Sequence, residues 1–137
     1  AGIDINTPSK GVVIFDADND GRQDMFVTRD ANKPLFFHNQ TPSVGAWLGV
    51  KVQGSTTNRD GLGALISVTP VEGEEPQLAY VGTSGSFLTH DGRVKHFGLG
   101  KLTTNIFEVK VTFPASGKEV VLNNVKPQQV INVTEPE

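Results

Sequence analysis

Short apolar runs and strict alternation of apolar and polar residues dominate the pattern of this chain. Residues 107–113 (Phe-Glu-Val-Lys-Val-Thr-Phe) alternate at every step, as a strand with one buried face does. Residues 47–52 combine an apolar start with alternation, which predicts a strand that enters the core. The same criteria predict strands at residues 11–15, 23–29, 35–39, 47–53, 64–69, 77–82, 106–114, 119–122 and 129–134.

No segment of ten or more residues carries the 3.6-residue apolar stripe of an amphipathic helix, because glycine or proline interrupts every candidate window. The chain holds 15 glycines and 8 prolines, which suits many short elements joined by tight turns. Short strands with turn signals every ~8–12 residues are typical of sandwiches and barrels. The pattern therefore predicts an all-β fold, an antiparallel β-sandwich preceded by a β-hairpin.

The distribution of aspartate divides the chain into two parts near residues 41–45 (Thr-Pro-Ser-Val-Gly). Four aspartates crowd into residues 16–24, and the chain after the division is far poorer in them. We predict a hairpin unit over residues 1–44 and a sandwich over residues 45–137. A lone hairpin is marginally stable in water, so the first unit is expected to need packing partners.

Residues 16–24 (Asp-Ala-Asp-Asn-Asp-Gly-Arg-Gln-Asp) form the most informative segment. Oxygen ligands at alternate positions of a tight loop converge on one point, and Gly21 at the sixth position permits the sharp turn that brings later ligands round. Four crowded carboxylates repel one another unless a cation offsets them. The pattern predicts a Ca²⁺ site with the side chains of Asp16, Asp18, Asp20 and Asp24 and the main-chain carbonyl of Arg22 as ligands, and Asn19 stabilising the turn.

The loop is not an EF-hand, because Val27 occupies the twelfth position, where that motif places a bidentate glutamate. The flanking segments read as strands, so the loop joins strand to strand. Two alternatives stay open at this point: a solvent-exposed turn without a metal, and a Mg²⁺ or Mn²⁺ site, since hard oxygen sites overlap in preference.

Charge and composition exclude several classes of function. The net charge of −3 argues against nonspecific nucleic-acid binding, which needs a strongly basic surface. No apolar run approaches the ~20 residues of a membrane span. The absence of cysteine excludes disulfides, thiolate nucleophiles and cysteine zinc sites. No basic-then-apolar leader opens the sequence, which predicts either a cytosolic protein or a trimmed exported one.

Residues 11–15 (Gly-Val-Val-Ile-Phe) followed by the acidic loop resemble an FG-GAP repeat of the VCBS type. Such repeats bind calcium and build propeller blades in integrin α-subunits and related extracellular proteins. The chain holds a single copy, and a propeller needs several blades. The resemblance therefore implies the last repeat of a longer parent, or a hairpin adapted to the next domain.

Residues 47–135 resemble the ASPIC/UnbV domain, which follows FG-GAP repeats in cartilage acidic protein and its bacterial relatives. The residues that carry the resemblance are Trp47-Leu48, Gly54, 58–64, 82–88, 96–100, 109–117, 122–125 and Gln128-Gln129. The family usually has Trp-Pro where this chain has Phe113-Pro114. The resemblance implies export, to the cell surface, the extracellular space or the periplasm, and dependence on calcium.

Three further segments are interpreted as structural. Residues 58–61 are predicted to form a hydrogen-bonded turn; the alternative is that Asp60 contributes to a ligand site or to a second metal site. In residues 96–100, Phe97 and Leu99 are expected to pack inward, the glycines to let another strand pass closely, and His96 to be structural rather than a ligand. Residues 84–93 contain serine, histidine and Asp91, but triad members normally come from separated segments, so a turn is favoured.

The leading hypothesis is a non-enzymatic, calcium-stabilised extracellular module for adhesion or ligand binding, with a protein or glycan as partner. The first alternative is a carbohydrate-binding module, in which a buried Trp47 would leave Tyr80 as the aromatic platform. The second is an enzyme, either a metal-assisted hydrolase or a self-modifying domain that forms or cleaves an internal bond at Asp60-Gly61, Asp91-Gly92 or Asn123-Asn124.

Overall fold

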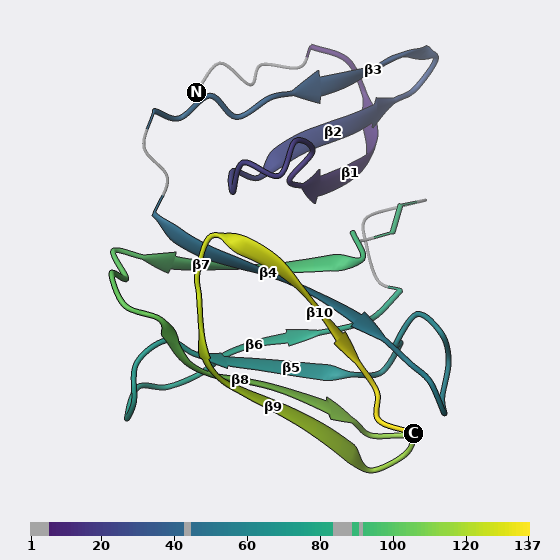
Figure 1. Ribbon diagram of the computed structural model, residues 1–137. Coiled ribbons are helices and arrows are strands. Elements are labelled where there is room, and N and C mark those ends of the chain that lie inside the picture. The colour runs from purple at the N-terminus through teal and green to yellow at the C-terminus, as the bar shows by residue number, and fades with distance from the viewer. Residues whose placement is uncertain (1–5, 43–44, 84–88, 91) are drawn as a thin grey trace. The chain divides into compact units, whose positions relative to one another are not determined.

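A computed structural model describes residues 6–42, 45–83, 89–90 and 92–137. This part of the chain forms ten β-strands and no helix, so nothing helical in it is long and apolar enough to cross a membrane (Figure 1). The all-β fold class is confirmed. The chain divides into two compact units, unit 1 with residues 1–44 and 83–92, and unit 2 with residues 45–82 and 93–137.

Unit 1 contains an antiparallel sheet in the order β1-β2-β3. Strand β1 is Ser9–Phe15, β2 is Asp24–Arg29 and β3 is Asn32–Phe37. Phe15 pairs with Asp24, so the acidic loop closes directly on the first register pair of the hairpin. The tight return from β2 to β3 places Ala31 at a φ of 53°, in the left-handed region.

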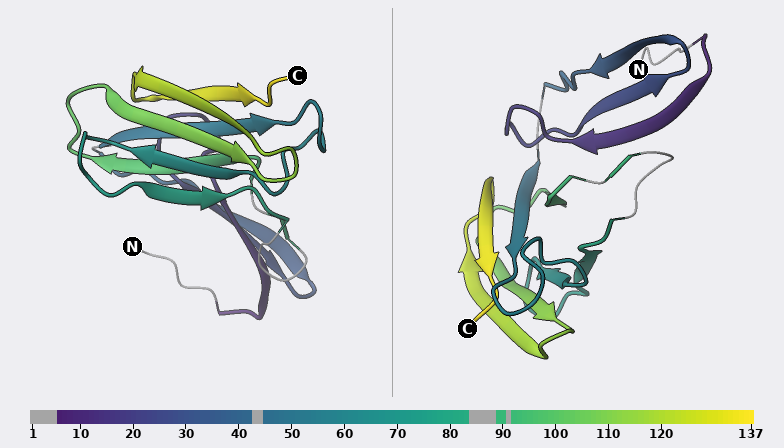
Figure 2. Two further views of the ribbon diagram at one scale, coloured as in Figure 1. Left: turned by 90° about the horizontal axis from the view of Figure 1, so that it is seen from below. Right: turned by 90° about the vertical axis from the view of Figure 1, so that its right-hand side faces the viewer.

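Unit 2 is a sandwich of two sheets, ordered β10-β4-β7 and β6-β5-β8-β9, which lie face to face (Figures 1 and 2). Its strands are β4 (Ala46–Gln53), β5 (Leu65–Thr69), β6 (Gln77–Tyr80), β7 (Val94–Gly100), β8 (Ile106–Phe113), β9 (Lys118–Val125) and β10 (Gln129–Thr134). All neighbouring pairs are antiparallel except β4 and β10, which run parallel from Gln129↔Leu48 to Thr134↔Gln53.

The core of unit 2 lies between the two sheets. Alternate residues of β4 enter it, with Leu48 and Val50 fully buried, while Lys51 faces solvent. The second sheet contributes Ile66 from β5 and Val111 from β8, also without exposure. The remaining core side chains are Ala46, Val52, Ala64, Val68, Val81, Phe97, Leu99, Ile106, Val109, Phe113 and Val133. Period-two alternation on facing sheets thus builds one continuous apolar layer.

Strand β7 is the element that the sequence pattern did not predict. Phe97 and Leu99 are buried, as expected, but glycines at positions 98 and 100 remove two of the side chains that would display alternation. The predicted close passage at these glycines is wrong, because a methyl group on Gly98 or Gly100 would meet no atom of the described residues within 4 Å, apart from its own chain neighbours. Gly100 instead supplies a left-handed φ of 60° where the strand ends.

The alternation predicted for residues 107–113 fails at its first position. Ile106 and Val109 are both fully buried, so the phase of burial shifts by one residue between them. Phe107, expected in the core, is 41% exposed instead. The partner strand departs from regular geometry at the same place, where Asn124 has a φ of 56°. A local irregularity of the β8–β9 ladder therefore turns one aromatic ring outward.

Candidate metal-binding loop

The acidic loop is folded by its own side chains. Asp16 accepts hydrogen bonds from the amides of Asp20, at 3.1 Å, and Gly21, at 2.8 Å, through its two carboxylate oxygens. The Asp20 carboxylate accepts one from the amide of Arg22 at 2.8 Å. Asn19 and Gly21 take left-handed φ angles of 60° and 87°, which confirms the turn predicted at the sixth position. These contacts bend the loop so that its alternate side chains converge.

Three of the predicted ligands are brought together. Asp16, Asp18 and Asp20 each offer a carboxylate oxygen, and these oxygens lie within 4.8 Å of one another. That spacing allows one hard cation to contact all three with little movement, since Ca²⁺–oxygen distances are ~2.3–2.6 Å. The two-residue spacing along the loop is what places them on one side of the turn.

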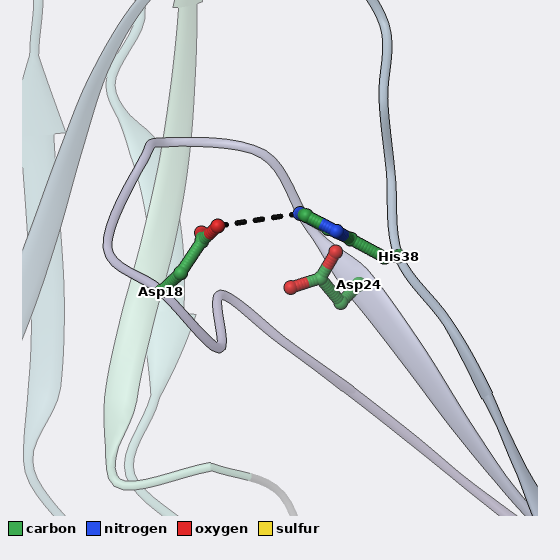
Figure 3. Close-up of side chains that lie close together, drawn as sticks. All are labelled: Asp18, Asp24 and His38. Carbon is green, nitrogen blue, oxygen red and sulfur yellow. Dashed lines mark ion pairs between the residues drawn. The ribbon is translucent and has the colours of Figure 1, made fainter.

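His38 joins a second, overlapping set that the sequence analysis missed. One ligand atom each of Asp18, Asp24 and His38 lies within 4.8 Å of the others (Figure 3). The Nε2 of His38 lies 3.2 Å from Asp18 Oδ2. The strand register explains the position of His38: Phe37, the last residue of β3, pairs with Met25, so the residue after the strand comes opposite Asp24. The spacing within residues 16–24 carries no information about His38, which lies 14 residues beyond Asp24.

Asp24 has a different environment from the other aspartates. It is 1% exposed, and its two oxygens accept the amides of Ala17, at 3.0 Å, and Asn39, at 2.7 Å. One carboxylate therefore ties both the loop and the segment after β3 to the start of β2. Because each carboxylate oxygen has two lone pairs, acceptance of one amide leaves capacity for a cation.

The expectation that only a cation relieves the charge repulsion needs correction. The Arg22 guanidinium forms an ion pair with Asp20, and His38 contacts Asp18. Asp16 and Asp24 each accept two amide hydrogen bonds. All four carboxylates thus have partners within unit 1, and a bound ion would compete with Arg22 and His38.

The other predicted site residues have structural surroundings. Asp60 pairs with Arg93 at 3.3 Å, within unit 2, and the preceding turn is closed by a 2.9 Å bond from the Gly61 amide to the Asn58 carbonyl. The ring of His96 stacks on Trp47 with centroids 5.6 Å apart. Residues 84–88 and Asp91 lie outside the described residues, and with them most of the serine–histidine–aspartate segment.

Glu135 is a buried carboxylate that the sequence analysis did not single out. It is 2% exposed, and its Oε2 accepts the amides of Ser55, Thr56 and Thr57 at 2.9, 3.0 and 3.0 Å, and the Thr57 hydroxyl at 2.9 Å. Burial alone raises the pKa of this group, but hydrogen bonds from Ser116, Thr57 and Ser55 outweigh it and lower the pKa to about 2. No motif of the sequence marks this contact, because its partners are distant along the chain.

Comparison with known proteins places the larger part of the chain. A search of curated proteins finds no match. The family model described as ASPIC and UnbV matches residues 54–137, which is more than half of the chain. This stretch contains most of unit 2 and leaves the acidic loop outside, so the FG-GAP resemblance of that loop stays a prediction. The chain belongs to the ASPIC and UnbV family.

Proposed function

We propose that this protein is a calcium-stabilised, non-enzymatic extracellular module that serves adhesion or ligand binding within a larger secreted protein. The observation that carries the proposal is the convergence of carboxylate oxygens from Asp16, Asp18 and Asp20 within 4.8 Å. The ion would be held by these side chains, by Asp24 and by the carbonyl of Arg22, and it would fix the return from β1 to β2.

The chemistry of the donors favours calcium within this loop. Ca²⁺ takes six to eight oxygens in a flexible shell, whereas Mg²⁺ demands near-ideal octahedral geometry and retains its waters. A loop that already uses several carboxylate lone pairs for amides offers an irregular shell, which suits the larger ion. Affinities of ~10⁻⁴–10⁻³ M are typical of extracellular calcium modules, and millimolar calcium outside the cell would fill such a site.

Thermal unfolding of the chain in calcium and in chelator tests the proposal. An ion that binds only the folded form stabilises it by about 2.7 kcal/mol at a hundredfold excess over Kd, which raises the Tm by several degrees. Isothermal titration with Ca²⁺, and separately with Mg²⁺, gives the affinity and the selectivity directly. Coincident melting curves together with no heat of calcium binding would overturn the calcium part of the proposal.

Asp18→Asn is the informative variant, because Asp18 belongs to both ligand sets. Asp30→Asn is its matched control: Asp30 is also an aspartate of unit 1, but it pairs with Lys10 at 2.9 Å and lies outside both sets. We expect calcium affinity to fall at least tenfold in Asp18→Asn and to stay unchanged in Asp30→Asn. Equal affinities in the two variants would show that the loop does not hold the ion.

A further inference from the structure

Unit 2 has a pocket whose lining residues do not belong to the acidic loop. It has a volume of about 510 Å³, and it lies where β5 ends, β8 begins and β9 ends. Volumes of roughly 300–1,000 Å³ are typical of small-molecule sites. The lining comes from three segments: the loop after β5 with Val71 and Glu72, the start of β8 with Asn105 and Phe107, and the end of β9 with Asn123 and Asn124.

Phe107 gives this pocket an aromatic wall. Phe107 is 41% exposed, and Val71, which also lines the pocket, is 42% exposed. The backbone under the ring is fixed, because the Phe107 amide donates to the Pro70 carbonyl at 3.0 Å. Phe107 faces outward because the burial pattern of β8 shifts by one residue between Ile106 and Val109. The same irregularity therefore places an aromatic ring in the pocket lining.

Carboxamides form the polar side of the pocket. Asn105 Nδ2 donates to Asn124 Oδ1 at 3.0 Å, which fixes the orientation of both side chains. A carboxamide has two donor hydrogens and an oxygen with two lone pairs, so this bond leaves donors and acceptors on both. Asn124 holds a left-handed φ of 56°, an unfavourable conformation for most residues that asparagine tolerates better.

The charge of the residues that line the pocket argues against an anionic ligand. Among the described residues that line the pocket, Glu72 is the only ionisable one, and no lysine or arginine accompanies it. Phosphates, sulfates and carboxylates therefore find no cationic partner here. The lining instead combines an exposed aromatic ring with fixed amide donors and acceptors. A sugar ring matches both features, since it has a face of C–H groups and an edge of hydroxyls.

We propose that this pocket binds a neutral carbohydrate, whose ring packs on Phe107 and whose hydroxyls hydrogen-bond to Asn105, Asn123 and Asn124. The inference rests on the ligand-binding part of the proposed function and names its ligand class. It does not depend on the calcium part, because the pocket belongs to unit 2 and the acidic loop to unit 1. Failure of one can therefore be distinguished from failure of the other.

The test is a glycan array probed with the full chain in calcium, followed by titration of the best soluble oligosaccharide into four variants. Phe107→Ala removes the ring. Asn124→Gly removes the carboxamide while keeping a residue that accepts the left-handed φ. Gln128→Gly is its control, because Gln128 also has a positive φ, 60°, and does not line the pocket. Tyr80→Ala controls for aromatic exposure, since Tyr80 is 61% exposed outside the pocket.

We expect neutral glycans on the array, and an affinity at least tenfold weaker in Phe107→Ala and about tenfold weaker in Asn124→Gly. Both controls should bind like the parent chain. Four results would overturn the proposal: an array without neutral hits, a preference for acidic glycans, full binding by Phe107→Ala, or loss of binding in Tyr80→Ala alone. Asp18→Asn reports separately on calcium, so glycan binding that survives in it leaves this inference standing whatever the loop does.

Discussion

The Glu135 carboxylate and the Ser55 amide are 80 residues apart in the sequence, yet they form a 2.9 Å hydrogen bond. The amides of Thr56 and Thr57 converge on the same oxygen. Three successive amides around one anion form a cradle that stabilises negative charge without a basic residue. Since Glu135 follows β10 and Ser55 follows β4, this contact anchors the end of the parallel strand pair.

Replacement of Glu135 by glutamine should destabilise unit 2 in a pH-dependent manner. The folded-state pKa is lowered from 4.5 to about 2, so the carboxylate contributes stability that is fully present above pH 4.5. That contribution is lost as the pH falls toward about 2. Urea denaturation at several pH values should show a gap between parent and Glu135→Gln that is largest at neutral pH and narrows below pH 4.5.

Glu137→Gln is the matched control for this experiment, because Glu137 is exposed and lies two residues further along the chain. Its unfolding midpoints should follow those of the parent at every pH. A gap between parent and Glu135→Gln that stays constant from pH 7 to pH 3 would show that ionisation of Glu135 does not stabilise the fold.

An added methyl group should destabilise unit 2 at one glycine, Gly54, and have little effect on stability at another, Gly98. A Cβ on Gly54 would lie 2.1 Å from the Asn58 carbonyl oxygen, a backbone atom that cannot move aside without opening the turn. Gly54→Ala should therefore cost about 1–3 kcal/mol of unfolding free energy. In Gly98→Ala the new Cβ has no other atom of the described residues within 4 Å except those of its chain neighbours, so the unfolding free energy should change by no more than about 0.5 kcal/mol. Equal urea midpoints for the two variants would contradict this.

Most of the sandwich could be predicted because its strands display their burial locally. Val109, Val111 and Phe113 repeat every second residue, and the structure buries each of them. Strand β7 does not show alternation of apolar and polar side chains, because positions 98 and 100 are glycines and have no side chain. The outward Phe107 could not be predicted either, because the shift in β8 depends on the left-handed Asn124 of the neighbouring strand.

The candidate site shows the same division between local and distant signals. The loop turn at Gly21 and the convergence of Asp16, Asp18 and Asp20 follow from spacing alone. His38 and Glu135 enter through register and topology, which bring together residues that no short motif connects.

Asp24 should matter for folding even without an ion. It is buried, and both oxygens accept amides, from Ala17 and Asn39. Asparagine at this position would turn an NH₂ group toward one of these amides and leave it without an acceptor, at a cost of about 1–3 kcal/mol. Hydrogen exchange of the Ala17 and Asn39 amides in chelator should therefore accelerate in Asp24→Asn. Asp18→Asn, which makes the same change of charge, should leave the exchange rates of these two amides unaltered. Equal acceleration in both variants would show that the hydrogen bonds of Asp24 do not stabilise the loop and the segment after β3.

His38 allows the identity of the metal to be tested. Calcium prefers oxygen ligands, whereas imidazole suits zinc and other transition metals. His38→Phe removes both ring nitrogens and retains a ring that can stack on Phe36, whose centroid lies 6.2 Å from that of His38. Titration with Ca²⁺ should give an affinity equal to the parent or higher, because Asp18 loses a competing partner. Titration with Zn²⁺ should give an affinity about tenfold lower.

The control is His90→Phe, because His90 lies outside both ligand sets, and this variant should change neither affinity. If Ca²⁺ affinity in His38→Phe instead falls together with that of Zn²⁺, the imidazole takes part in holding both ions, and the prediction of a calcium site built from oxygen ligands alone is wrong.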